Sequence, residues 1–129
     1  MAGEYLLDTN VLISFLKEEA ETVERVAAAV SIVIPFVVLG ELFYGARNSS
    51  HWDQNLARVE LLASRFNVLF ADLFTIREYG RIRAELKAAG RPIPEADLWI
   101  AALSLQHQLT LVSRDDHFRE VSGIQLECW

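Results

Sequence analysis

Short apolar runs alternate with longer amphipathic segments along the chain, and this alternation limits the possible folds more than any other feature. The runs "EYLLD", "SIVIP" and "LTLVS" are apolar and bounded by turn residues, as buried strands are. Between them, apolar residues recur at helical spacing. Strands that alternate with helices form a mostly parallel sheet covered by helices on both faces. We therefore expect an α/β sandwich with a central sheet of four or five strands.

The 129 residues are predicted to form one domain, 1–129, because the chain is domain-sized and contains no repeats or low-complexity linkers. A turn at 47–53 is expected to supply Ser or Asp as a helix cap, and Asp72 is expected to cap the next helix. The predicted strands are 4–8, 31–35, 67–72, 109–113 and possibly 124–128, and the predicted helices are 11–30, 36–45, 55–66, 73–90 and 97–108.

Composition restricts the classes of function. The net charge of -6 argues against a large basic surface for duplex DNA but is compatible with an RNA-cleaving enzyme whose acids surround metal ions. The single cysteine, Cys128, cannot form an internal disulfide, and the first residues lack the pattern of a signal peptide. The longest apolar region, 26–40, is interrupted by Pro35 and is too short to span a membrane. We expect a cytoplasmic protein.

Glu41 is the most unusual acid in the chain. It lies in the apolar segment "FVVLGELFYG", where a helix would place no basic residue on its stripe. A charge buried there without a partner costs several kcal/mol or more. A salt bridge to a distant arginine would be one solution and a bound cation another, unless the segment is unusually wet.

Three further acids are expected near Glu41, because functional groups of open parallel sheets gather at the carboxyl ends of the strands. Asp8 follows the first strand, Asp115 follows the fourth, and Asp97 begins the helix before the fourth. Taken singly, Asp8 and Asp97 could be helix-end residues and Asp115 a turn residue. Together the four carboxylates predict a site for Mg²⁺ (or Mn²⁺), which prefers oxygen ligands and can activate water against a phosphodiester.

Four segments carry a resemblance to a known family: "LLDTNVLI", "LGELFYGA", "DLWIAALSLQHQLTLVSRDDHF" and "GIQLECW". In this order and spacing the chain resembles a PIN domain of the VapC toxin type from about Tyr5 to Trp129. The resemblance implies a PIN-like three-layer sandwich and a metal-dependent endoribonuclease, a toxin that inhibits translation by hydrolysing RNA to leave a 5′-phosphate and a 3′-hydroxyl. It also implies a cognate antitoxin of the VapB type, which would cover a hydrophobic groove.

By position, the resemblance implies that the metal and catalytic residues are Asp8, Glu41, Asp97 and Asp115. The fourth place is open, because Asp116 stands beside Asp115. Thr9, Asn10 and Ser113 match positions that support the acids through hydrogen bonds.

Candidate RNA-binding residues come from a basic strip and from the flanks of the acidic site. A solvated helix face explains the strip equally well. The candidates are Arg47, Arg77, Arg81, Arg91 and Arg114. The histidines, His51, His107 and His117, are interpreted as surface or packing residues, because they lack the paired spacing of a zinc site. His117 lies near the acidic turn and could instead assist proton transfer. Trp52, Trp99 and Trp129, with other apolar positions, favour a homodimer.

Two other functions remain open at this stage. A non-cleaving RNA-binding translation inhibitor would use the basic strip without hydrolysis. A phospho-acceptor signalling domain would place a metal between Asp8 and Asp72, but such domains normally need a lysine after the last strands. The only lysines here are Lys17 and Lys87.

Overall fold

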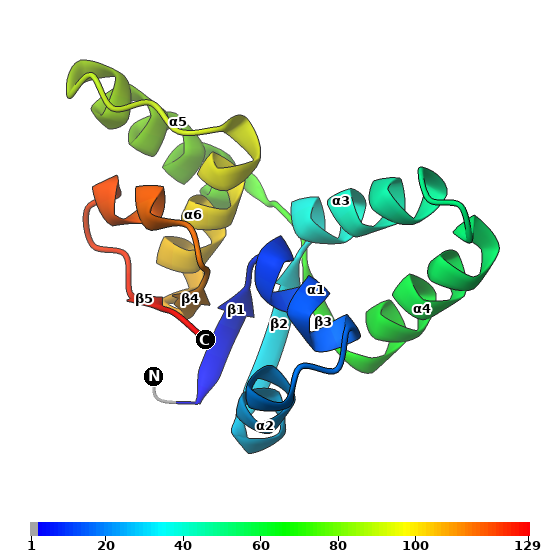
Figure 1. Ribbon diagram of the computed structural model, residues 1–129. Helices are drawn as coiled ribbons and strands as arrows, with labels where there is room; N and C mark the ends of the chain where they lie inside the picture. Colours follow the sequence, from blue (N-terminus) through cyan, green and yellow to red (C-terminus); the bar gives the residue numbers. More distant parts are fainter. Residues whose placement is uncertain (1–2) are drawn as a thin grey trace.

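Five strands form one parallel sheet in the order β3-β2-β1-β4-β5 (Figure 1). The structure is a computed structural model that describes residues 3–129. β1 pairs with β2 on one side and with β4 on the other, so Leu6 lies beside both Val33 and Leu111. The α/β prediction is confirmed, and the possible fifth strand is present. The strands are β1 (Glu4–Leu7), β2 (Ser31–Pro35), β3 (Asn67–Leu69), β4 (Thr110–Val112) and β5 (Leu126–Glu127).

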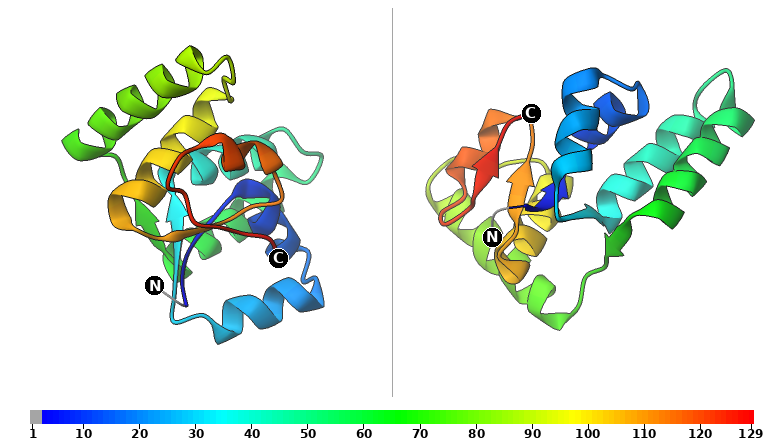
Figure 2. Two further views of the ribbon diagram at one scale, coloured as in Figure 1. Left: turned by 90° about the vertical axis from the view of Figure 1, so that its left-hand side faces the viewer. Right: turned by 90° about the horizontal axis from the view of Figure 1, so that it is seen from below.

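Helices cover both faces of the sheet. α1 and α2 lie on one side and α5 and α6 on the other, while α3 and α4 pack together as a hairpin beside α1 (Figure 2). No helix within residues 3–129 is long and apolar enough to cross a bilayer. The helices are α1 (Thr9–Leu16), α2 (Ala20–Ala28), α3 (Phe36–Arg47), α4 (Trp52–Arg65), α5 (Leu73–Ala88) and α6 (Glu95–His107), with a 3₁₀ helix, η1 (Asp116–Glu120).

The core is densest around β1, β4 and α6. Leu6, Leu7 and Leu111 in the strands are fully buried, as are Ile100 and Leu103 of α6. Because α6 is surrounded by the sheet, α3 and α5, buried residues recur on more than one of its faces. This packing fixes the ends of β1, β4 and α6 relative to one another.

The predicted continuous helix 11–30 is wrong, because the chain turns between α1 and α2. Glu18 has a left-handed backbone with φ of 58°, and Ser14 and Thr22 form a buried side-chain hydrogen bond of 2.7 Å across the turn. Alanine and glutamate favour helix, so propensity does not reveal the break. The break coincides with the buried tertiary contact between Ser14 and Thr22.

Two other local predictions need correction. Strand β3 ends at Leu69, so the predicted strand 67–72 is too long, and Asp72 caps α5 by accepting the Thr75 N–H at 3.1 Å. Helix α4 follows His51, which makes no side-chain capping bond, so neither Ser nor Asp caps it. The Ser49 hydroxyl bonds the Ala46 carbonyl instead.

Candidate metal centre

Asp8 is fixed where β1 ends and α1 begins. Its own N–H donates to the Val112 carbonyl of the neighbouring strand β4 at 3.0 Å. The Thr9 N–H donates to Asp8 Oδ1 at 2.8 Å, and the Ser113 hydroxyl donates to Oδ2 at 2.6 Å. The residue is only 4% exposed. Asp8 is thus both the N-cap of α1 and a buried carboxylate held by two donors.

Glu41 reaches the same place from α3. The Thr9 hydroxyl donates to Glu41 Oε2 at 3.1 Å, so one residue of α1 contacts both acids. Helix α3 begins directly after β2, and α1 and α3 are in contact. Figure 1 shows both helices starting close to the tip of β1. Glu41 is exposed at the rim of the site, so of the alternatives left open by the sequence the solvated segment is the one found.

Asp97 and Asp115 complete the group from the opposite side. Asp97 lies in the first turn of α6, and Asp115 directly precedes η1. Asn10 Nδ2 lies 3.5 Å from Asp115 Oδ2, and the Asp115 N–H donates to the Ser113 hydroxyl at 3.1 Å. Ser113 therefore contacts two of the acidic residues at once.

Asp115, and not Asp116, lies with the other acids. One oxygen each of Asp97 and Asp115 and one ring nitrogen of His117 lie within 4.8 Å of one another. The Asp116 side chain is 91% exposed and pairs with Arg119 at 3.3 Å. The turn that follows β4 directs adjacent acidic side chains to different surroundings.

His117 lies in the site, although the sequence analysis favoured a surface or packing role over its alternative, proton transfer beside the acidic turn. Its Nε2 contacts Asp97 Oδ2, and its side chain is 34% exposed. A surface or packing role is therefore wrong for this histidine, whereas His51 and His107 are exposed. The pattern Asp-Asp-His directly after a strand end was the available signal, because the spacing lets one turn present an acid and an imidazole together.

The candidate RNA-binding arginines have other partners in this structure. Arg91 pairs with Glu120 at 2.6 Å, and Arg81 pairs with Glu78 and Glu85. The guanidinium groups of Arg47 and Arg77 lie over the rings of Trp52 and Phe74, at 5.8 and 5.7 Å from the ring centroids. These contacts leave the solvated-face interpretation open.

Arg114 holds the chain together beside the site. Its side chain donates to the Trp129 carbonyl at 3.1 Å and to the Ser14 hydroxyl at 3.0 Å. Its N–H donates to Asn10 Oδ1 at 3.3 Å. The guanidinium thus connects the turn after β4 to α1 and to the last residue, which assigns it a structural role here.

Burial and mutual repulsion shift the titration of the acids. Burial raises the pKa of Asp8, with a smaller contribution from Asp115, while bonds from Ser113 and Thr9 oppose the shift. Partial burial likewise raises the pKa of Glu41, with Asp8 and Asp97 adding to it. The pKa of Asp97 is also raised by burial, against an opposing effect of His117. In the part of the chain described, no lysine or arginine forms an ion pair with any of the four acids.

The donor set fits a divalent cation. Carboxylates from four separate segments repel one another, and a hard cation would relieve this repulsion while accepting their oxygens as ligands. Neighbouring hydroxyl and amide groups hold Asp8, Glu41 and Asp115 in place through hydrogen bonds, as outer groups around metal ligands do. The site can therefore hold a cation and, through it, phosphate oxygens.

A pH-dependent loss of stability is expected without metal. Because the folded-state pKa of Asp8 lies above its ordinary value of 3.8, this carboxyl stabilises the fold fully below that value, and its contribution disappears as pH rises through the raised pKa. In chelator, wild type should lose stability relative to Asp8→Asn as pH rises above the ordinary value of 3.8. Urea unfolding measures the difference, and added Mn²⁺ should stabilise wild type at the upper pH. A pH-independent difference would contradict the assignment.

Comparisons with known proteins agree with this architecture. Residues 5–124 match the family model described as PIN domain. The chain is 33% identical to Ribonuclease VapC1 of Haemophilus influenzae strain R2866, covering 97% of each, and 36% identical to the tRNA(fMet)-specific endonuclease VapC of Shigella flexneri, covering 98% of each. The crystal structure of DNA-bound VapBC from Salmonella typhimurium superposes with a TM-score of 0.90 at 33% identity, with 98% of both chains covered. The chain therefore belongs to the PIN-domain family and, within it, to the VapC group.

Proposed function

We propose that this protein is a metal-dependent endoribonuclease toxin that inhibits translation by hydrolysing RNA and is neutralised by a cognate antitoxin. The observation that carries the proposal is the meeting of Asp8, Glu41, Asp97 and Asp115 at one edge of the sheet. The names of the relatives, ribonuclease and tRNA(fMet)-specific endonuclease, support the same activity. Cytoplasmic RNA would be the substrate, which agrees with the free Cys128.

Each residue has a distinct task in the proposed reaction. The four acids would hold Mg²⁺ or Mn²⁺, which when bound polarises the phosphodiester and acidifies water. Ser113 and the Thr9 N–H orient the Asp8 carboxylate, and the Thr9 hydroxyl orients Glu41. Glu41 is exposed at the rim of the site, so besides helping to hold the ion its carboxylate can accept a proton from the attacking water. Water adds to phosphorus as the bond from phosphorus to the 3′ oxygen breaks, and the departing 3′ oxygen takes up a proton from solvent, which gives a 5′-phosphate and a 3′-hydroxyl.

Purified protein incubated with total RNA and with initiator tRNA tests the proposal. Cleavage should require Mg²⁺ or Mn²⁺, should stop in excess chelator and should resume when metal is restored. Products should carry 5′-phosphates, which a 5′-phosphate-dependent exonuclease detects. Cleavage that persists in chelator would contradict the metal centre. RNA that is retained in a gel shift but stays intact in Mn²⁺ would favour the non-cleaving RNA-binding alternative.

The phospho-acceptor alternative loses its geometric basis. Strand β2 lies between β1 and β3, so the ends of β1 and β3 are not neighbours. The Asp72 carboxylate caps α5 and also accepts a hydrogen bond from Gln106 at 2.8 Å. Hydrogen bonds from the Thr75 N–H and Gln106 lower the pKa of Asp72, as expected for a cap. Stable labelling of Asp72 by a small phosphodonor would be required to restore this alternative.

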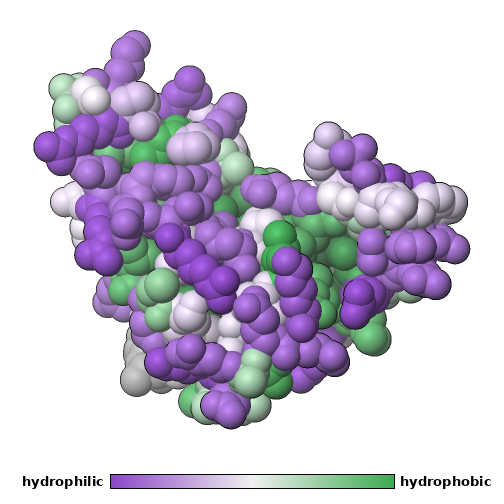
Figure 3. Space-filling model, viewed as in Figure 1, coloured by the Kyte–Doolittle hydropathy of each residue, from purple (hydrophilic) through white to green (hydrophobic). Residues whose placement is uncertain are grey.

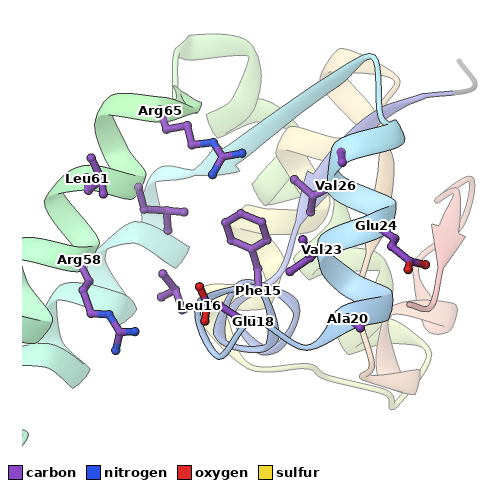
Figure 4. Close-up of a pocket in the computed structure, with 12 residues that line it drawn as sticks. Phe15, Leu16, Glu18, Ala20, Val23, Glu24, Val26, Arg58, Leu61 and Arg65 are labelled. Atoms are coloured by element: carbon purple, nitrogen blue, oxygen red, sulfur yellow. The ribbon is translucent and has the colours of Figure 1, made fainter.

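The proposed antitoxin site is an apolar cavity of about 560 Å³ between the α1–α2 turn and α4. Figure 4 shows Phe15 and Val23 facing it from one side and Leu61 from the other. In the surface view, hydrophobic side chains gather in the hollow between these elements (Figure 3). The similar VapBC structures contain toxin and antitoxin together, which supports assigning an antitoxin to this chain.

Leu61→Asp should weaken antitoxin binding while RNA cleavage by the free toxin stays unchanged. Leu61 is 69% exposed, so the change costs little folding energy but places a charge in the apolar cavity. Loss of a buried apolar anchor at an interface corresponds to at least about tenfold in affinity. Calorimetry with the purified antitoxin measures it, with Glu60→Gln on the same helix as control. Unchanged affinity would place the antitoxin elsewhere.

A homodimer is proposed from a second apolar surface at the start of α5. Phe70, Leu73, Phe74 and Ile76 are 71%, 58%, 62% and 53% exposed, whereas Trp129 is buried and cannot contribute. Contiguous exposed apolar side chains commonly mark an interface. Phe74→Glu should convert the dimer to a monomer in analytical ultracentrifugation, while Glu85→Gln, also on α5, should leave it dimeric. A monomeric wild type would contradict the proposal.

A further inference from the structure

The turn after β4 brings a nitrogen donor to the acidic centre. His117 lies two residues after Asp115, at the start of η1, and its ring returns to the first turn of α6. Its Nε2 contacts Asp97 Oδ2, and the Asp97 side chain is only 13% exposed. Phe118, the next residue, is fully buried, and its ring centroid lies 5.0 Å from that of His117. The buried neighbour thus anchors the turn that presents the imidazole.

The contact between Nε2 and Oδ2 has two chemical explanations. A lone pair on Nε2 would repel a carboxylate oxygen, so the contact is attractive when Nε2 carries a proton or when both atoms bind one cation. Asp115 favours the second arrangement, because one of its oxygens lies within 4.8 Å of an oxygen of Asp97 and of a ring nitrogen of His117. Ligands of one octahedral ion lie roughly 3 Å apart when adjacent and about 4.2 Å apart when opposite. The three side chains therefore offer donor atoms at separations close to those of ligands that share one ion.

We propose that His117 is a ligand of the metal ion, so that the centre offers an imidazole nitrogen beside its carboxylates and favours Mn²⁺ over Mg²⁺. This inference rests on the proposed metal-dependent function and specifies which ion the site selects. Mg²⁺ prefers an all-oxygen shell, whereas imidazole suits transition metals. A neutral nitrogen also adds a ligand without adding negative charge to four clustered acids.

Pulsed electron paramagnetic resonance of Mn²⁺ bound to the purified full-length protein tests the proposal without any activity measurement. Wild type should show ¹⁴N modulation from a directly bound imidazole. Labelling histidine with ¹⁵N should replace this modulation with that of ¹⁵N. His117→Gln should lose the modulation and still bind Mn²⁺ through its carboxylates. His107→Gln removes an exposed histidine at the end of α6 and should keep it.

Calorimetry should give a matching result. His117→Gln should weaken Mn²⁺ binding by about tenfold and Mg²⁺ binding by no more than about threefold, so the preference for Mn²⁺ falls. If wild type binds Mn²⁺ without ¹⁴N modulation, His117 is only a hydrogen-bond partner of Asp97 and the inference fails, while the proposed nuclease site stands. If wild type binds neither ion, the proposed metal-dependent function fails as well.

Discussion

Asp8→Asn should lower the rate of RNA cleavage by about a thousandfold, because it removes the most enclosed carboxylate of the proposed metal centre. A divalent ion contributes several kcal/mol of charge stabilisation in the transition state, and about 1.4 kcal/mol corresponds to tenfold in rate. Asparagine keeps the shape of aspartate and can still accept the Thr9 N–H that caps α1. The expected loss is therefore one of metal binding and catalysis, and not of folding.

Single-turnover cleavage of a labelled RNA at saturating Mn²⁺ measures this effect. Asp53→Asn, an exposed aspartate in the first turn of α4, serves as a matched control and should cleave at the wild-type rate. Urea unfolding in chelator should show that Asp8→Asn is at least as stable as wild type near neutral pH, since burial raises the pKa of Asp8. Cleavage within about threefold of wild type would remove Asp8 from the catalytic group.

Much of the fold follows from local sequence patterns. The buried strands "EYLLD" and "SIVIP" are apolar enough to be recognised without tertiary information, and their spacing by helices requires a parallel sheet. Once β1 and β4 are neighbours, Asp8 and Asp115 must lie at one edge, because the carboxyl ends of parallel strands coincide. The convergence of Asp8 and Asp115 therefore follows once β1 and β4 are known to be neighbours, whereas Glu41 and Asp97 reach the site from helices. The roles of all four acids remain proposals.

The other features of the fold and of the site could not be predicted, because they depend on tertiary contacts that a sequence pattern does not contain. The exposure of Glu41 depends on where α1 and α6 lie relative to α3, so an apolar sequence around it was misleading. The turn at Glu18 accompanies a bond between Ser14 and Thr22, which no propensity encodes. Predicting the contact of the His117 ring would require the direction of a 3₁₀ turn. A shift of one residue in that turn would place the ring beside a different neighbour.

The sequence and the structure suggest different roles for the Arg114 side chain. An arginine beside an acidic site in sequence suggests a phosphate contact. In the structure its guanidinium instead bonds Ser14 of α1 and the carbonyl of Trp129, whose ring packs edge-on against Tyr5 of β1. These bonds connect the turn that carries Asp115 to the elements that carry Asp8. The position of this turn thus depends on contacts outside the group of four acids.

Phe118→Ala should destabilise the protein by about 3–5 kcal/mol, the usual cost of removing a fully buried phenylalanine. Phe118 is the largest fully buried side chain and belongs to the short helix η1, between the residues His117 and Arg119. Its removal leaves a cavity directly below the turn that presents Asp115 and His117. Because a 3₁₀ helix of five residues has little intrinsic stability, this turn should lose its fixed position when its anchor is removed.

Urea unfolding monitored by circular dichroism measures the stability of Phe118→Ala, and calorimetry measures its affinity for Mn²⁺. We expect the affinity to fall by about tenfold in the folded variant, since loss of groups that orient metal ligands has this effect. Val30→Ala, which truncates an 81% exposed valine outside the proposed dimer surface, should change the free energy of unfolding by no more than about 0.5 kcal/mol and leave Mn²⁺ affinity unchanged. A destabilised Phe118→Ala that binds Mn²⁺ as wild type does would show that the metal centre does not depend on this anchor. The position of Asp115 would then have to be set by its bonds to Asn10 and Ser113 alone.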